Sequence, residues 1–108
     1  MPIPRKCKIK DAVYAIKRLP KADRETLRGW CDTKAKAIYI NLDDKEVDKA
    51  STLYHEVLHA ILHEYKINFR KDRRWFKEAS VTAMEEAKMQ VFRENPKVTQ
   101  YVWPHVTP

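Results

Sequence analysis

Apolar residues recur with a helical period through the middle of the chain. At roughly 100° per residue, one stripe is formed by Val47, Tyr54, Leu58, Ile61 and Tyr65. The pattern predicts a helix that ends near Tyr65. Its start is indicated by Asp43, which can act as N-cap, with Glu46 three residues later in the spacing of a capping box.

A second helical pattern runs from about Arg74 to Glu94, and the Asn95-Pro96 step predicts its end. One line along this helix holds Glu78, Thr82, Glu85, Met89 and Phe92, so that two carboxylates lie among partly apolar neighbours. The tail KVTQYVWPHVTP contains two prolines. We therefore expect an extended tail whose aromatic side chains pack on the rest of the protein.

The N-terminal part of the chain has weaker periodicity. The segment Asp11–Leu19 is too short for its period to distinguish a strand from a short helix, and Pro20 ends it in either case. Ala37–Asn41, AIYIN, is the clearest strand because β-branched and aromatic residues follow a polar turn. Trp30–Asp32 can pair with it in a hairpin, and KADRETLRG reads as a loop or a single turn.

Composition narrows the class of protein. A chain of 108 residues predicts one domain spanning residues 1–108, and 44% hydrophobic with 34% charged residues is typical of soluble globular proteins. No apolar run approaches the roughly 20 residues that cross a bilayer, and the N-terminus has no apolar signal-peptide region. We therefore expect a cytoplasmic protein without membrane association, in which Cys7 and Cys31 are reduced thiols.

The net charge of +7, with a pI near 9.5, favours acidic partners, including nucleic acid. The basic residues are nevertheless spread along the whole chain. The densest cluster consists of Lys66, Arg70, Lys71, Arg73, Arg74 and Lys77. A cluster between two helices is more typical of a solvated linker, so nucleic-acid binding is only a weak expectation and the oligomeric state is not predicted.

Three of the four histidines lie on the first predicted helix, where His55-Glu56-x-x-His59 forms the HExxH pattern. Residues four apart point to one side of a helix, so both imidazoles can bind one Zn²⁺ at about 2.0–2.1 Å. Glu56 would then act on a water at the metal as general base. A solvated, His-rich helix face is the alternative, but the two histidines border the apolar stripe, which favours a metal site.

The third ligand must come from another segment. His63 continues the spacing, but it lies about 12 Å along the axis from His55, too far to share one metal. A carboxylate on the second helix is the natural candidate. Glu78 and Glu85 share a face of that helix, and composition and spacing do not choose between them.

Longer stretches of the chain resemble a known family. "AIYINLDDKEVDKASTLYHEVLHAILHEY", followed by "KEASVTAM" and "RENP", is similar to the small gluzincin-type metallopeptidases of the IrrE/ImmA-like group, especially compact stand-alone versions from bacteriophages and prophages. The preceding "GWCD" resembles a G-x-C-D often found there. The resemblance covers residues 29 to 96. It implies that the protein is located in the cytoplasm of a bacterial or phage-infected host cell.

The resemblance also implies a fold and a ligand set. The fold would be a minimal zincin-like α+β domain, in which a small N-terminal sheet of two or three strands packs on the HExxH helix and a second, C-terminal helix. It favours a strand for Asp11–Leu19. His55 and His59 match the histidine ligands, Glu56 the catalytic glutamate, and Glu78, in the "KEAS" context, the third ligand.

Two functions follow from these patterns. The first is a zinc-dependent metallopeptidase that cleaves a protein or peptide substrate with a zinc-activated water and Glu56 as general base. If Ala37–Asn41 forms the edge of the sheet, it could hold an extended substrate by strand addition. The second is a zinc-stabilised, non-catalytic binding protein that grips nucleic acid or a host protein. Glu56 favours the enzyme because a structural zinc site needs no base.

Overall fold

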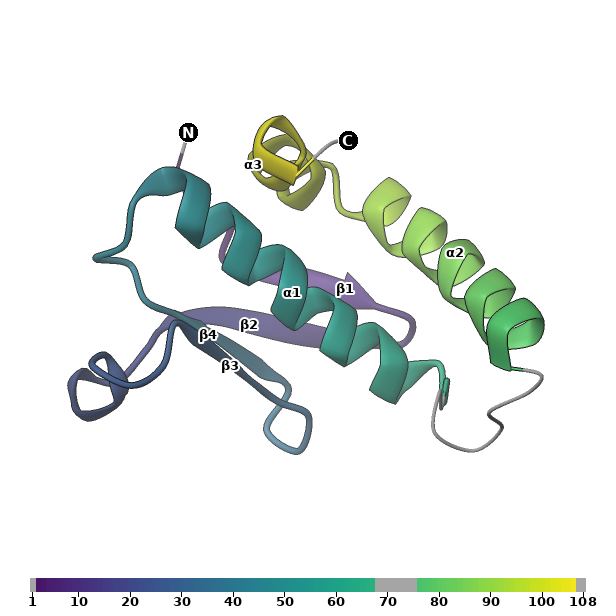
Figure 1. The fold of residues 1–108 in the computed structure, drawn as a ribbon, viewed down its shortest axis with the longest axis horizontal. Helices are drawn as coiled ribbons and strands as arrows, with labels where there is room; N and C mark the ends of the chain where they lie inside the picture. The colour runs from purple at the N-terminus through teal and green to yellow at the C-terminus, as the bar shows by residue number, and fades with distance from the viewer. Residues whose placement is uncertain (1, 68–75, 107–108) are drawn as a thin grey trace.

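The computed structural model describes the backbone of residues 2–67 and 76–106, and the side chains of residues 2–67 and 81–105. Its elements in chain order are β1 (Lys6–Ile9), β2 (Ala12–Arg18), the short 3-10 turn η1 (Lys21–Asp23), β3 (Gly29–Asp32), β4 (Ala37–Ile40), α1 (Glu46–Glu64), α2 (Phe76–Glu94) and α3 (Pro96–Val106). Figure 1 shows their arrangement. The predicted α+β class is confirmed.

The four strands form one sheet in the order β1-β2-β4-β3. β1 and β2 are antiparallel, β2 and β4 are parallel, and β4 and β3 form the predicted antiparallel hairpin. The sheet has one more strand than expected because β1 was not recognised in the sequence. β4 lies inside the sheet, paired on both sides, so the expectation that it could form the edge is wrong and β3 has that place.

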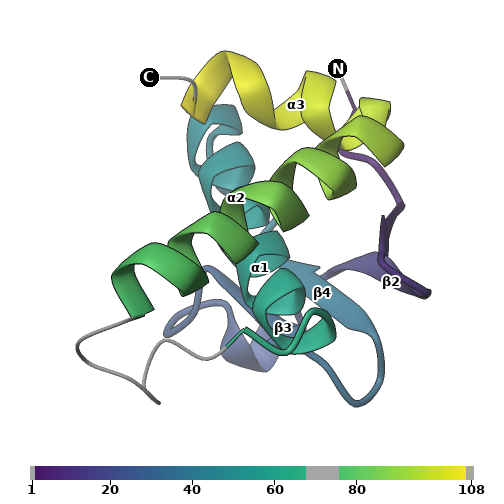
Figure 2. The same ribbon diagram turned by 90° about the vertical axis from the view of Figure 1, so that its right-hand side faces the viewer.

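Side chains alternate between two different faces of this sheet. Buried residues point toward α1: Cys7, Ile9, Tyr14, Ile38 and Ile40. Their neighbours along the strands, including Lys6, Lys8, Val13, Lys17 and Trp30, are exposed on the opposite face. Figures 1 and 2 show α1 lying across the first face, with α2 and α3 on the same side of the molecule.

The face of α1 that enters the core consists of Ala50, Leu53, Val57, Ala60 and Ile61, all fully buried. The predicted apolar stripe is therefore rotated, and it is wrong at Val47, which is 48% exposed. The first turn of α1 contacts α3, as the hydrogen bond of 2.9 Å from Tyr101 Oη to Glu46 Oε2 shows. The periodicity of apolar residues correctly predicted the helix. Which of its residues are buried depends on the element that each turn of α1 contacts.

The predicted capping role of Asp43 is also wrong. The N-cap of α1 is Lys45, which makes no side-chain capping hydrogen bond. The Asp43 carboxylate instead accepts hydrogen bonds from Arg18 Nη1 at 3.2 Å and Arg24 Nη1 at 3.4 Å. The guanidinium groups of Arg18 and Arg24 therefore bind the carboxylate that was expected to cap the helix.

The predicted extended tail is in fact helical, as α3. Pro96 begins it, where its fixed φ suits a helix and its missing N–H is not needed. Val98, Tyr101 and Val102, at a spacing of three and four, are buried in the core. Pro104 lies in the last turn. Burial of one helical face thus outweighs the prolines that suggested an extended chain.

Two other expectations concern the membrane and the cysteines. Among the residues that the structure describes, no helix combines the length and the apolar character needed to cross a bilayer. Cys7 is buried and Cys31 is partly buried, and both are free thiols, as expected.

The C-terminal turn of α1 is fastened to the sheet by a charged cluster. Glu64 Oε2 accepts hydrogen bonds from Tyr14 Oη at 2.6 Å and from Lys36 Nζ at 2.5 Å. Burial acts to raise the pKa of Glu64, but the Lys36 ammonium and the Tyr14 hydroxyl outweigh it, so the pKa is lowered overall. The ionised carboxylate is therefore stabilised by folding.

We expect Glu64→Ala to lower the free energy of unfolding by about 1–3 kcal/mol at pH 7, because the buried Tyr14 hydroxyl loses its acceptor. Urea titration measures the change. Glu25→Ala, at an exposed residue with no ion pair among the described residues, should change stability by no more than about 0.5 kcal/mol.

The lowered pKa adds a pH test to this variant. The stabilisation is present above the unfolded-state pKa, near 4.3, and is lost as the pH falls through the lower folded-state pKa. The gap in stability between wild type and Glu64→Ala should therefore narrow as the pH falls below about 4. A gap that stays constant at every pH would contradict the electrostatic part of the account.

Candidate metal centre

His55 and His59 lie one turn apart on α1 and turn their rings toward each other. Their Nε2 atoms are 3.0 Å apart, and the ring planes meet at 80°. Two imidazoles that bind one tetrahedral zinc have nitrogens about 3.3 Å apart, given Zn–N bonds of 2.0–2.1 Å. Both side chains are exposed, so a cation can reach them. The pair therefore fits a shared divalent metal with only a small adjustment.

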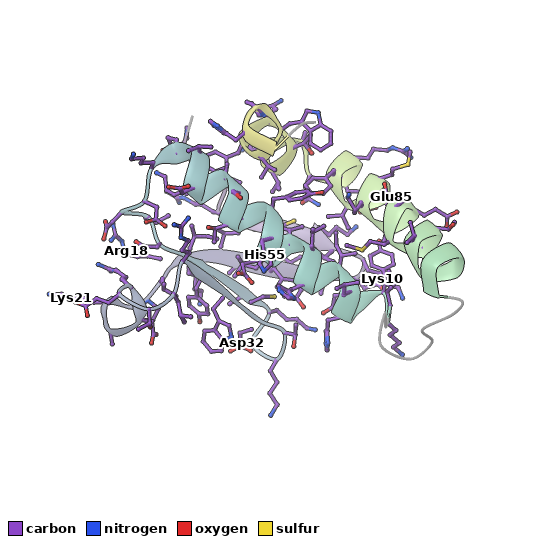
Figure 3. All side chains as sticks on the ribbon, in the orientation of Figure 1. Lys10, Arg18, Lys21, Asp32, His55 and Glu85 are labelled. Carbon is purple, nitrogen blue, oxygen red and sulfur yellow. The ribbon has the colours of Figure 1, made fainter. Side chains whose placement is uncertain are left out.

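The packing of α1 sets the direction of these two side chains. Leu53, Val57 and Ala60 are fully buried against the sheet, which fixes the rotation of the helix about its axis. His55 and His59 follow on the flank of that buried face, at the middle of the helix, as Figure 3 shows for His55. The site is thus built on a rigid element in the core of the fold.

Glu56 differs from its two neighbours because it points into the protein and is only 7% exposed. Burial raises the pKa of its carboxyl group, while His55 and His59 act in the opposite direction. The effect of His55 and His59 on this pKa shows that the buried carboxyl group lies within electrostatic reach of both imidazoles.

Gly29 of β3 allows the sheet edge to approach α1 at this site. A Cβ added at residue 29 would lie 2.4 Å from Thr52 Cγ2, 2.9 Å from the Tyr39 carbonyl oxygen and 3.4 Å from Glu56 Cγ. The first two distances are shorter than any normal contact. The absence of a side chain at Gly29, and not an unusual backbone conformation, is what this approach requires.

We expect Gly29→Ala to lower the free energy of unfolding by about 1–3 kcal/mol, because the added methyl group overpacks the contact between β3 and α1. Thr52→Ser removes the closer obstacle and should recover part of that loss in the double variant, as urea titration would show. Strictly additive effects of the two substitutions would contradict the predicted contact.

Glu78 and Glu85 were the two candidates for the third metal ligand. Glu78 lies in the first turn of α2, and its side chain is outside the described residues. Glu85 is described and is not brought to the histidines: it is exposed, its carboxylate is 3.4 Å from Lys88 Nζ, and Figure 3 shows it well separated from His55. Among the described side chains, no group of three or more His, Cys, Asp or Glu residues is arranged to hold a metal.

His63 does not join the pair formed by His55 and His59. Its side chain is 53% exposed, and its Nε2 lies 3.9 Å from the Glu64 carboxylate at the end of α1. The rise of the helix therefore separates it from the site, as the spacing predicted.

Sequence reasoning missed the role of β3 as the strand beside the site. The Asn41 N–H donates to the Arg28 carbonyl at 2.9 Å, which makes these two residues a hydrogen-bonded pair. Because such pairs alternate, Gly29 and Cys31 turn their backbone N–H and C=O groups away from β4, toward the open edge. The stretch "GWCD", which forms β3, was the only indication of this strand's importance in the sequence. It could not show that β3 lies at the edge of the sheet.

Cys31 also faces α1 at this edge. Burial, with a contribution from the negative charge of Glu56, raises the pKa of the Cys31 thiol to about 12. Since metals bind the thiolate, a thiol that remains protonated at neutral pH is a poor ligand. The expectation that Cys31 is a reduced thiol agrees with this environment.

Comparison with known proteins identifies a family. The family model described as Peptidase_M78, IrrE N-terminal-like domain, matches residues 7–92, a segment that runs from β1 to near the end of α2 and contains His55, Glu56 and His59. No curated protein and no solved structure shows a significant match to the chain.

Proposed function

Because the chain belongs to the IrrE N-terminal-like family, a metallopeptidase-type domain, we propose that it is a zinc-dependent peptidase that hydrolyses peptide bonds in a protein or peptide substrate. The family predicted from the sequence is confirmed by this match. The observation that carries the proposal is the convergence of the His55 and His59 Nε2 atoms at 3.0 Å, with the buried Glu56 between them in sequence.

In this proposal His55, His59 and Glu78 hold the metal. Two imidazoles and one carboxylate are a donor set typical of catalytic zinc sites, in which a fourth position stays open. Zn²⁺ bound there would supply a Lewis acid that polarises the scissile carbonyl group and makes a water molecule more acidic. Glu78 is chosen over Glu85 because Glu85 is exposed and is turned to Lys88.

Glu56 is the general base. It accepts a proton from the attacking water and passes that proton to the nitrogen of the leaving amine. Burial raises the pKa of the Glu56 carboxyl group above its ordinary value, which makes the carboxylate a stronger base toward the water proton. Gly29 leaves the space beside Glu56 free of a side chain, since a Cβ added at residue 29 would lie 3.4 Å from Glu56 Cγ.

The edge strand β3 is the proposed substrate-binding strand. An extended peptide can pair with the free N–H and C=O groups of Gly29 and Cys31 and so become a fifth strand of the sheet. This arrangement places the peptide backbone beside Gly29, where an added Cβ would lie 3.4 Å from Glu56 Cγ. It replaces the strand Ala37–Asn41 suggested by the sequence, because that strand is paired on both sides.

The test is to incubate the zinc-loaded protein with a mixture of unfolded proteins and then with a lysate of its host, and to map new peptide termini by mass spectrometry. We expect new termini that disappear with a chelator and return when zinc is added. Stoichiometric zinc binding without any cleavage would contradict the proposal and favour a zinc-stabilised binding protein.

A further inference from the structure

The sheet face that points away from α1, here called the outer sheet face, carries an unusual set of side chains. It consists of Lys6 and Lys8 on β1, Val13, Ala15 and Lys17 on β2, Trp30 and Asp32 on β3, and Ala37 and Tyr39 on β4. Val13 is 56% exposed and Trp30 is 48% exposed. Large apolar side chains are thus presented to solvent on a face that neither α1 nor the other helices cover (Figures 1 and 2).

Two aromatic rings form the apolar part of this face. Trp30 and Tyr39 are direct partners across β3 and β4, and their rings are stacked, with centroids 5.5 Å apart and planes 20° apart. Parallel rings on a sheet surface leave an outer ring face on which another flat ring can continue the stack. Nucleic-acid bases are flat rings that bind single-strand binding proteins in this way.

Lysines lie beside the aromatic pair on the neighbouring strands. Lys17 is the direct β2 partner of Tyr39, so Trp30, Tyr39 and Lys17 form one row across three strands, about 10 Å long. Lys6 lies in the next row, opposite Ala15. Neither Lys6 nor Lys17 forms an ion pair with a described residue, so both ammonium groups are available for a ligand.

The other charged groups of the face leave its positive character intact. Lys8 is 3.8 Å from the Glu94 carboxylate and is therefore partly neutralised. Asp32 is the one acid that the four strands place on this face, and its carboxylate accepts hydrogen bonds from the N–H groups of Lys34 and Ala35 at 3.0 and 2.9 Å. The acid is thus engaged in the turn at the end of β3.

From this arrangement we propose that the outer sheet face binds single-stranded nucleic acid, with bases stacked on Trp30 and Tyr39 and phosphates paired with Lys6 and Lys17. A sheet with stacked aromatics and flanking cations suits an unpaired strand, whose bases can turn toward the protein. A duplex keeps its bases stacked inside and offers no ring to this surface. An acidic protein would pair with the lysines but would not require the parallel ring faces on which a base can stack.

The proposal is independent of the metal centre, because α1 lies on the opposite face of the sheet. It also differs from the basic cluster that the sequence suggested between the two long helices, most of which is outside the described residues. Its test can therefore succeed or fail whatever the outcome for peptide hydrolysis.

The experiment measures binding of the full chain to a short fluorescently labelled oligothymidylate by anisotropy, over a series of salt concentrations. We expect Trp30→Ala to weaken binding by about 5- to 100-fold, the usual effect of losing one stacking ring. Trp30→Phe keeps a ring and should stay close to wild type. His55→Ala should bind the oligonucleotide as the wild type does, because it changes only the metal centre.

The lysines are tested by the salt dependence. The double substitution Lys6→Ala with Lys17→Ala should make the slope of log affinity against log salt shallower by about 1.4, since each phosphate contact with a single strand contributes about 0.7. Lys45→Ala with Lys66→Ala removes the same charge from exposed residues that flank the two ends of α1 and should leave the slope nearly unchanged.

Three outcomes would overturn the proposal. The first is no binding by the wild-type protein at low salt. The second is equal loss of affinity in the two lysine pairs, which would indicate a diffuse charge effect. The third is competition by polyglutamate at the same charge concentration together with full binding by Trp30→Ala, which would assign the face to an acidic protein.

Discussion

Glu56→Gln should lower the rate of peptide hydrolysis by about 10²- to 10⁴-fold while leaving zinc content and folding close to those of the wild type. Glutamine has nearly the shape of glutamate but cannot accept the proton of the attacking water. Glu56 is not a proposed ligand, so the imidazoles of His55 and His59 stay in place. The measurements are peptide cleavage, metal content by elemental analysis and unfolding in urea.

A matched control for this variant is Glu46→Gln, the same substitution on the same helix. Glu46 lies in the first turn of α1, where it accepts a hydrogen bond from Tyr101. Its substitution should affect stability slightly and the rate of hydrolysis not at all. If Glu56→Gln cleaves as fast as Glu46→Gln, Glu56 is not the base. If neither Glu56→Gln nor the wild type cleaves, but both keep their biological effect, the zinc-stabilised binding protein is favoured.

The part of the site that the sequence predicted is the part that local geometry determines. His55 and His59 are four residues apart on one helix, and a helix brings such residues together whatever the rest of the chain does. The distance of 3.0 Å between their Nε2 atoms follows from this spacing. The burial of Glu56 could not be predicted in the same way, because it depends on how closely Gly29 of another element approaches.

The fold shows the same division between local and long-range effects. The strand Ala37–Ile40 and the two long helices were predicted from their own residues, whereas the strand Ala12–Arg18 was favoured over a short helix only by the family resemblance. The order of strands was not, because β2 pairs with β4 in parallel across the intervening η1 and β3. That one long-range pairing moves β4 into the interior and leaves β3 at the edge, which changes the proposed substrate-binding strand.

The helical tail shows how tertiary burial overrides local signals. Pro104 and Pro108 suggested an extended tail, whereas Pro96 begins α3 and Pro104 lies in its last turn. Val98 and Val102 are buried on one face between Pro96 and Pro104. The helical spacing of these valines was visible in the sequence, but its significance depended on α1 offering an apolar surface to α3.

His55→Ala and His59→Ala should each abolish tight zinc binding and with it the added thermal stability that zinc gives the wild type. Each substitution removes one of two imidazoles whose nitrogens converge on a single position. The loss of affinity should exceed the 10- to 100-fold that is typical of removing a residue that only supports a ligand. Elemental analysis after dialysis and the zinc-dependent rise in melting temperature measure both effects.

The same assay identifies the third ligand and tests the whole arrangement. Glu78→Ala should release zinc, whereas Glu85→Ala and His63→Ala should retain one ion per chain, since Glu85 is turned to Lys88 and His63 lies beside Glu64. If Glu85→Ala releases zinc and Glu78→Ala does not, Glu85 is the third ligand. If the His55→Ala variant still binds one zinc per chain, the metal site lies elsewhere, because the shared site needs both the His55 and the His59 imidazole.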